Sequence, residues 1–308
     1  MEVVKSLLND PSCNVDAMLT RDLYFNISYQ LAPSPTPTST SLTAFNWACA
    51  HGQFHVVEFL LKSPRIDPTK KSSNETTPFN TACYRGRDEV VKLLLRDPRI
   101  DVNEPNKSDM SPINNACFMG HLNVAFMLAS ETRVNVKHTS ASGASPLQGA
   151  AFIGHASIVG MLLTSDRVDI NQFDSQWTAI SIAAYYGNLS TVQRFLASGR
   201  PINLILKNKN NKTALEIALS CPTRERLSFE TDEVYNRAKK MGPAIARLLT
   251  EFGRNFGQVQ SELRAQRESF LFFFLFSFPF FPNFFSFFFS GLLKSPLPSW
   301  FPPRPRIS

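Results

Sequence analysis

The chain has 308 residues, of which 43% are hydrophobic and 19% are charged, and its formal net charge is +7. This length is enough for one extended domain with a sizeable core. Six Lys or Arg against two Glu give residues 254–308 a net charge of +4, which leaves +3 for residues 1–253. Because no dense basic patch is interleaved with aromatic residues, the composition argues against nucleic-acid binding.

The cysteine content and the start of the chain indicate a compartment. None of the five cysteines has an evident disulfide partner, and no secretory signal peptide opens the sequence. Reduced cysteines are typical of intracellular proteins. We therefore expect a cytoplasmic or nuclear localisation.

Residues 1–16 begin in the middle of a pattern that recurs further along the chain. The segment 2–11 aligns with the segment 89–98, which is an apolar helix followed by Asp-Pro. We interpret 1–16 as a partial repeat that holds only its outer helix, and we hypothesise that the protein begins upstream. Half a repeat leaves apolar surface uncovered.

Residues 17–42 interrupt the pattern. Pro33, Pro35 and Pro37 alternate with Ser and Thr, a composition that is typical of a flexible linker. We predict that this segment is a disordered insertion.

A fixed period organises residues 43–253. Each unit begins with Thr or Ser, then Pro or Ala, then an apolar residue, and the starts are Thr43, Thr77, Ser111, Ser145, Thr178 and Thr213. Their separations are 34, 34, 34, 33 and 35 residues. Such a period is the signature of a solenoid, in which each unit buries its apolar face against its neighbours.

One unit shows how the period is expected to fold. Pro78 follows a Thr and suits the first turn of a short helix. The small residues Ala82 and Cys83 allow two helices to approach closely, and Gly86 suits the left-handed residue that ends a helix. The run 90–95 then places apolar residues at helical spacing. Each unit is predicted to be a helix, a tight turn, a second helix and an extended loop.

These motifs resemble the ankyrin repeat over residues 43–253. The resemblance implies an all-α helical repeat solenoid of about six repeats, each a helix-turn-helix with a hairpin loop. The His of the family's Thr-Pro-Leu-His motif is replaced in successive repeats by Asn46, Asn80, Asn114, Gln148, Ser181 and Glu216. Amide and hydroxyl side chains still bond to backbone groups, so we expect the loops to be held.

The resemblance also implies a binding surface. In ankyrin proteins the concave face is formed by hairpin tips and by two variable residues before the inner-helix Gly. The matching candidates for partner binding are Tyr84, Arg85, Phe118, Met119, Phe152, Ile153, Trp177, Tyr185 and Tyr186. An exposed stripe of such residues is typical of a protein interface. The alternative is that one residue of each pair packs beneath the adjacent hairpin.

Two residue series that recur with the period favour structural roles. Cys49, Cys83 and Cys117 each fill a small position of an inner helix, and their spacing is the repeat period itself. We interpret them as core residues, since they lie too far apart for a disulfide or a metal site. His121 and His155 follow an inner-helix Gly and are interpreted as turn-stabilising residues.

A third series consists of arginines that follow the outer helices. An aligned set of arginines could bind an acidic partner or phosphate groups. We favour the interpretation that they are solvated turn residues near an Asp such as Asp67, Asp101 or Asp169. The series is Arg65, Arg99, Arg133, Arg167 and Arg200.

The sequence lacks the motifs of common catalytic sites. Glycine-rich phosphate loops, zinc-type His-Glu spacings and nucleophile elbows do not occur. We therefore expect no enzymatic activity, no cofactor and no metal.

The C-terminal part divides into three segments. Residues 213–253 are predicted to form a terminal repeat with a polar outer surface, and residues 254–269 a polar linker helix. Residues 270–308 are a low-complexity tail rich in Phe and Pro.

The first part of this tail, 270–293, has 24 residues without a charge. It is long enough to span a bilayer, although Pro279 and Pro282 weaken a helical span. The alternative is translation of a non-coding pyrimidine tract, since pyrimidine-only codons specify Phe, Leu, Ser and Pro. Both interpretations stay open.

The sequence as a whole predicts a non-enzymatic scaffold or adaptor. We expect it to act as a monomer and to bind a protein partner on the concave ankyrin face. Two alternatives remain: the same repeats tethered to a membrane through 270–293, or a regulatory fragment of a larger multidomain protein.

Overall fold

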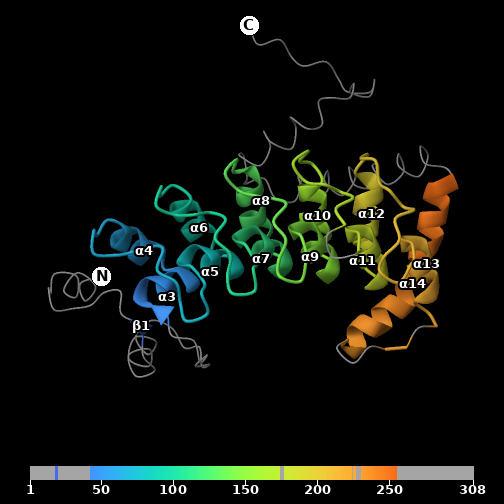
Figure 1. The fold of residues 1–308 in the computed structure, drawn as a ribbon, viewed down its shortest axis with the longest axis horizontal. Coiled ribbons are helices and arrows are strands. Elements are labelled where there is room, and N and C mark those ends of the chain that lie inside the picture. The colour runs from blue at the N-terminus through green and yellow to red at the C-terminus, as the bar shows by residue number, and fades with distance from the viewer. Residues whose placement is uncertain (1–17, 20–41, 174–176, 224, 227–229, 255–308) are drawn as a thin grey trace, which may run out of the picture.

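The computed structural model describes residues 18–19, 42–173, 177–223, 225–226 and 230–254. In these residues the helices alternate between an inner and an outer layer (Figure 1). The inner helices are α3 (Ala44–Ala50), α5 (Pro78–Tyr84), α7 (Pro112–Met119), α9 (Pro146–Ile153), α11 (Ala179–Tyr185) and α13 (Ala214–Ser220). The outer helices are α4 (Phe54–Leu61), α6 (Asp88–Leu94), α8 (Leu122–Ser130), α10 (Ala156–Leu162), α12 (Leu189–Ala197) and α14 (Asp232–Arg254).

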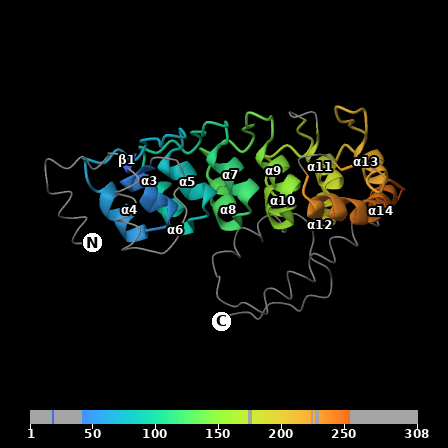
Figure 2. The same cartoon turned by 90° about the horizontal axis from the view of Figure 1, so that it is seen from below.

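The repeats stack side by side into an elongated solenoid. Figure 2 shows the connecting loops along one edge, the inner helices below them and the outer helices on the far side. The architecture confirms the predicted solenoid, and each inner helix starts directly after a predicted unit start.

Several predicted segments lie outside the described residues. These are the partial repeat 1–16, most of the linker helix 254–269 and the tail 270–308. The insertion 17–42 is described only near its ends, where β1 (Met18–Leu19) pairs antiparallel with β2 (Leu42–Thr43). This short strand pair was not predicted.

A Thr or Ser hydroxyl caps the start of every inner helix in the described repeats. The Oγ1 atom of Thr77, for example, accepts a hydrogen bond from the backbone N–H of Asn80 at 3.1 Å. In Ser145 the cap is reciprocal, because the Gln148 side chain also accepts from the Ser145 backbone N–H. These contacts satisfy N–H groups that have no partner within the helix.

Two inner-helix glycines show why this turn requires glycine. Gly86 and Gly120 have φ angles of +64° and +84°, in the left-handed region. The next repeat also approaches closely: a Cβ at Gly86 would lie 2.4 Å from Nδ1 of His121, and one at Gly120 would lie 2.6 Å from Cε1 of His155. A larger residue at either position would strain the backbone and push the following repeat away.

The core runs continuously through the stack. In the inner helices from α3 to α11, one large apolar side chain near the start, such as Phe79 or Ile113, is at most 2% exposed. Outer-helix residues such as Val91 and Leu94 pack against it from the other layer. Each repeat therefore buries its apolar face only with the help of its neighbours.

Amide side chains at the fourth position of the motif connect each repeat to the next. Nδ2 of Asn114 donates to the carbonyl oxygens of His138 and Ala144 at 3.2 and 3.1 Å. Asn46, Asn80 and Gln148 make equivalent bonds to the following hairpin. The prediction that these residues hold the loops is confirmed, and the loop that they hold belongs to the next repeat.

Ser181 and Glu216 differ from this pattern. The Oγ atom of Ser181 bonds to the hydroxyl of Thr178 at 2.6 Å, within the same repeat. Glu216 forms a capping box with Thr213, whose backbone N–H it accepts at 2.7 Å. At these two positions the recorded bonds stabilise the start of the helix rather than the adjacent hairpin.

The arginine series also connects neighbouring repeats. Nη2 of Arg99 donates to the carbonyl oxygen of Leu61 at 3.1 Å, and Nη2 of Arg133 donates to that of Leu95 at 2.8 Å. These acceptors lie at the C-terminal ends of the preceding outer helices, whose last carbonyls have no partner within the helix. The arginines are therefore structural, as predicted, but they are links between repeats rather than merely solvated turn residues.

Two arginines of this series pair with a carboxylate two residues earlier in the chain. Arg99 pairs with Asp97 at 2.6 Å and Arg133 with Glu131 at 3.2 Å. The recorded carboxylate partner of Arg99 is therefore Asp97, whereas the sequence suggested Asp101 as the nearby acid.

The last repeat ends in a long helix. Residues 232–240, which are rich in charge, belong to the same helix as the more apolar residues that follow, so α14 has 23 residues. Gly242 lets it approach α13 closely, since a Cβ there would lie 2.7 Å from Cβ of Cys221. Its first turns also reach the preceding repeat, where a Cβ at Gly187 would lie 2.6 Å from Cα of Ala238.

The amide links generate a test of stability. The Asn114→Ala variant removes a hydrogen-bond donor from two carbonyl groups of the next hairpin, so we expect the free energy of unfolding to fall by about 1–3 kcal/mol. Urea denaturation followed by circular dichroism measures this change. Asn210→Ala, in an exposed hairpin tip, is the control, with a change below about 0.5 kcal/mol. Equal losses in the two variants would contradict the proposed link.

Candidate functional site

The predicted surface residues lie at the C-terminal ends of the inner helices. Tyr84, Phe118 and Phe152 occupy equivalent positions in α5, α7 and α9, and their side chains are 39%, 36% and 37% exposed. Met119 and Arg85, the second residues of two pairs, are exposed as well. The remaining candidates, Ile153, Trp177, Tyr185 and Tyr186, are half-buried.

The rings contact one another across the repeats. Phe118 and Phe152 stack with ring centroids 6.1 Å apart, and the ring of Tyr186 meets that of Phe152 edge-on at 4.4 Å. Tyr185 lies 5.0 Å from Tyr186 and 5.4 Å from Trp177. We call Tyr84, Phe118, Phe152, Trp177, Tyr185 and Tyr186 the aromatic row.

The two ends of the row differ in exposure. At the N-terminal end the guanidinium carbon of Arg85 lies 5.7 Å from the ring centroid of Tyr84, so this ring carries a cation on its face. At the other end Tyr185 packs against Trp177 of the adjacent hairpin. Of the two variable residues before the inner-helix Gly, the first is thus exposed in the middle repeats. Tyr185 instead packs against the adjacent hairpin, which was the alternative interpretation.

Side chains from the next repeat hold the backbone of the row. Nε2 of His121 lies 2.9 Å from the carbonyl oxygen of Tyr84, and Nε2 of His155 lies 3.2 Å from that of Phe118. A carbonyl group only accepts, so each imidazole donates through Nε2–H. The prediction that both histidines stabilise turns is confirmed, and each turn belongs to the preceding repeat.

The same contact is made by residues that the sequence analysis did not single out. Nδ2 of Asn188 donates to the carbonyl of Phe152 at 3.0 Å, and Nε of Arg87 donates to that of Ala50 at 2.9 Å. Both residues follow an inner-helix Gly, as the histidines do. That shared position in the period was the signal that could have identified them.

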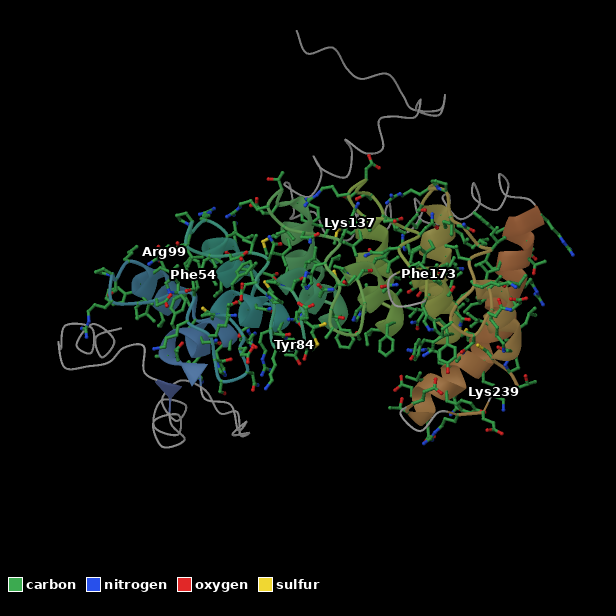
Figure 3. All side chains as sticks on the ribbon, viewed as in Figure 1. Phe54, Tyr84, Arg99, Lys137, Phe173 and Lys239 are labelled. Carbon is green, nitrogen blue, oxygen red and sulfur yellow. The ribbon has the colours of Figure 1, made fainter. Side chains whose placement is uncertain are left out.

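Helix α14 supplies the last of these contacts. Nε of Arg237 donates to the carbonyl of Tyr186 at 3.1 Å, so the first turns of α14 support the end of the aromatic row. Figure 3 shows Tyr84 and Lys239 along the lower side of the molecule.

The large exposed apolar side chains of the described residues lie on inner helices or in loops, and none of them lies on an outer helix. Leu219, in the last inner helix, is 62% exposed. It occupies the period position of the buried Ala184, and Ser220 occupies that of Tyr185.

Three of the cysteines lie in the core of the stack. Cys49, Cys83 and Cys117 are completely buried, which confirms their predicted place in the core. Burial raises the pKa of each of these thiols above its ordinary value, so the reactive thiolate is disfavoured. No group of three or more His, Cys, Asp or Glu in the described ranges could hold a metal ion.

Comparison with known proteins identifies the family. A family profile described as ankyrin repeats (3 copies) matches residues 1–106 and 45–140, and one described as ankyrin repeats (many copies) matches residues 161–218. These matches cover more than half of the chain. The chain belongs to the ankyrin repeat family.

Ankyrin repeats generally serve as modules for protein–protein interaction, and the fold is typically non-enzymatic. An ankyrin repeat domain from Acinetobacter baumannii AYE has a similar fold, with a TM-score of 0.52 and 21% sequence identity. The match covers 65% of this chain and 96% of that domain. No curated protein matches this sequence.

The membrane alternative receives no support from the described helices. None of them combines the length and apolar character that crossing a bilayer requires. The segment 270–293 lies outside the residues that the structure describes.

Because His155 supports the backbone of the aromatic row, we expect the stability of the repeats to depend on pH. Burial lowers the pKa of His155 below its ordinary value, although the hydrogen bond to Phe118 opposes this shift. The unfolded chain therefore takes up a proton at a higher pH than the folded repeats do. Acidification from about pH 7.5 to about 5.5 should reduce the part of the stability that depends on His155.

The His155→Asn variant tests this dependence. Asn188 makes the same contact one repeat later, so Asn should keep the hydrogen bond without titrating. We expect the variant to gain thermal stability relative to the wild type as the pH falls. The control is His55→Asn, at an exposed position, and its difference in thermal stability from the wild type should stay the same as the pH falls. A constant difference between His155→Asn and wild type at all pH values would contradict the prediction.

Proposed function

We propose that the repeats in residues 43–253 bind a protein partner through the face that carries the aromatic row, and that the chain acts as a non-enzymatic scaffold or adaptor. The observation that supports this most directly is the exposure of Tyr84, Phe118 and Phe152 at the same position of three successive repeats. Aromatic side chains of this kind anchor many protein interfaces.

The arrangement is also rigid, which favours binding. The carbonyl groups of Tyr84, Phe118 and Phe152 are each hydrogen-bonded by a side chain of the next repeat. The helix ends that present these rings are therefore fixed before a partner arrives. A surface that needs little reordering loses less conformational entropy on binding.

The family supports the same conclusion at a general level. Ankyrin repeats are interaction modules, and the candidate surface occupies the positions that form the concave face in the family. The five inner helices from α3 to α11 contain no charged residue, so the floor of this face is neutral or aromatic. Depletion of charge is typical of interface centres.

A triple variant tests the proposal. Tyr84→Ala, Phe118→Ala and Phe152→Ala together remove the exposed rings and leave the half-buried Tyr185 and Trp177 in place. Affinity capture with the full chain identifies a partner, and titration calorimetry compares wild type and variant. Loss of interface anchors should weaken binding at least about tenfold.

The control removes exposed apolar side chains outside the row. Phe173 is 39% exposed and Ile205 is 80% exposed, and both lie in loops. The Phe173→Ala, Ile205→Ala variant should bind the partner as the wild type does. If the triple variant binds equally well, or if it unfolds while the control remains folded, the aromatic row is not the binding surface.

A further inference from the structure

The recorded charged contacts with the aromatic row come from arginine side chains. Arg85 lies over the ring of Tyr84, and Arg237 bonds to the backbone of Tyr186. No carboxylate occurs in the inner helices from α3 to α11. The recorded ionic and polar contacts with the row therefore come from basic or neutral side chains.

The hairpins of the first repeats contain carboxylates as well as bases. Lys71 forms an ion pair with Glu104 of the next hairpin. Nε2 of His138 lies 3.2 Å from a carboxylate oxygen of Asp109. Part of the positive charge at this end of the stack is therefore paired with carboxylates.

The hairpin of the last repeat is different. Lys207, Lys209 and Lys212 lie within one tip and all three are exposed. Glu216 is the nearby carboxylate, and it is already engaged in the cap of Thr213. Hydrogen bonds from Thr213 lower the pKa of Glu216, and the positive charges of Lys207 and Lys212 lower it further.

The first turns of α14 add basic side chains at the same end. Arg237 contacts the row, and Lys239 lies 5.8 Å from the ring of Tyr235. Of the acidic residues there, Asp232 pairs with Arg226 and Glu233 lies in the first turn of the helix. The last repeat thus combines three exposed lysines in its hairpin with one carboxylate, Glu216, that is already engaged in a helix cap.

We propose that the partner presents an acidic segment with aliphatic or aromatic side chains, and that its carboxylates pair with Lys207, Lys209 and Lys212 while its apolar side chains cover the aromatic row. This inference rests on the proposed function. Opposite charges at the rim of an interface steer association and select partners. An apolar centre with a basic end fits such a segment better than it fits a neutral or basic one.

The charge of this chain argues against two other ligands for the surface, its own C-terminal tail and a second copy of the chain. Residues 255–308 carry five Lys or Arg against two Glu, so the chain's own tail would bring like charges to the lysines. A second copy carries a net charge of +7. Like charges across an interface are repulsive, so a separate acidic protein is the better fit.

Peptide pools test the chemistry of the partner. Three synthetic pools have the same content of Leu and Phe, and one is rich in Glu, one is neutral and one is rich in Lys. We expect the full-length protein to bind the Glu-rich pool about tenfold more tightly than the neutral pool at low salt. Added salt should reduce this preference by screening the exposed charges.

Two charge variants locate the preference. Lys207→Gln, Lys209→Gln and Lys212→Gln together should abolish it. Lys62→Gln, Lys92→Gln and Arg96→Gln remove the same charge from the outer side of the first repeats and should preserve it. Melting curves establish that both variants are folded. The inference would be overturned if both variants lost the preference for the Glu-rich pool equally, or if the wild type bound the Glu-rich and neutral pools equally.

The aromatic variant separates this inference from the proposed function. If the Tyr84, Phe118 and Phe152 triple variant loses binding to every pool while charge has no effect, the binding surface stands and the acidic partner is rejected. If the Glu-rich pool still binds the aromatic variant at full strength, the proposed surface itself is rejected.

Discussion

Hydrogen bonds from side chains of one repeat to the backbone of a neighbour are the interaction on which this structure depends. A short helix leaves its last carbonyl groups without partners, and a hairpin leaves others. Here the neighbouring repeat supplies the donors: Asn114 to a hairpin, His121 to an inner helix and Arg133 to an outer helix. The apolar core supplies the attraction between repeats, whereas these bonds fix their register.

The same bonds determine which side chains face outward. A carbonyl at the end of an inner helix points toward the next repeat, where His121, His155 or Asn188 meets it. The aromatic side chain of the same residue then lies over the surface instead of filling the space between repeats. The same arrangement therefore stabilises the repeats and exposes the aromatic rings. A substitution that removes the hydrogen bond to the carbonyl should disturb the surface as well.

Much of this fold follows from local sequence. Thr77 and Gly86 mark the ends of an inner helix because capping and left-handed geometry involve only a few neighbouring residues. The partner of Arg99 could not be predicted in this way. Its acceptor, the carbonyl of Leu61, is separated by 38 residues and becomes a neighbour only after the repeats have stacked.

The candidate surface shows the same division. The repeat period placed Tyr84, Phe118 and Phe152 at one face, but exposure depends on what packs above each ring. Tyr185 is half-buried and packs against Trp177 of the hairpin that precedes α11, although it occupies the same position of the period. A single sequence states the position of a residue in the repeat and not which side chains of the adjoining hairpin pack over it.

The length of the surface follows from where the repeats cease to be regular. In the first described repeat Ala50 occupies the row position and is buried, while Trp47 packs against His51 with ring centroids 4.0 Å apart. In the last repeat Ser220 occupies the row position, and α14 replaces a short outer helix and reaches back to Tyr186. A serine and a charged helix thus bound one end, and an alanine bounds the other. A partner that is recognised through the rings must therefore match the repeats between these limits, because only there does the row offer both exposure and a fixed backbone.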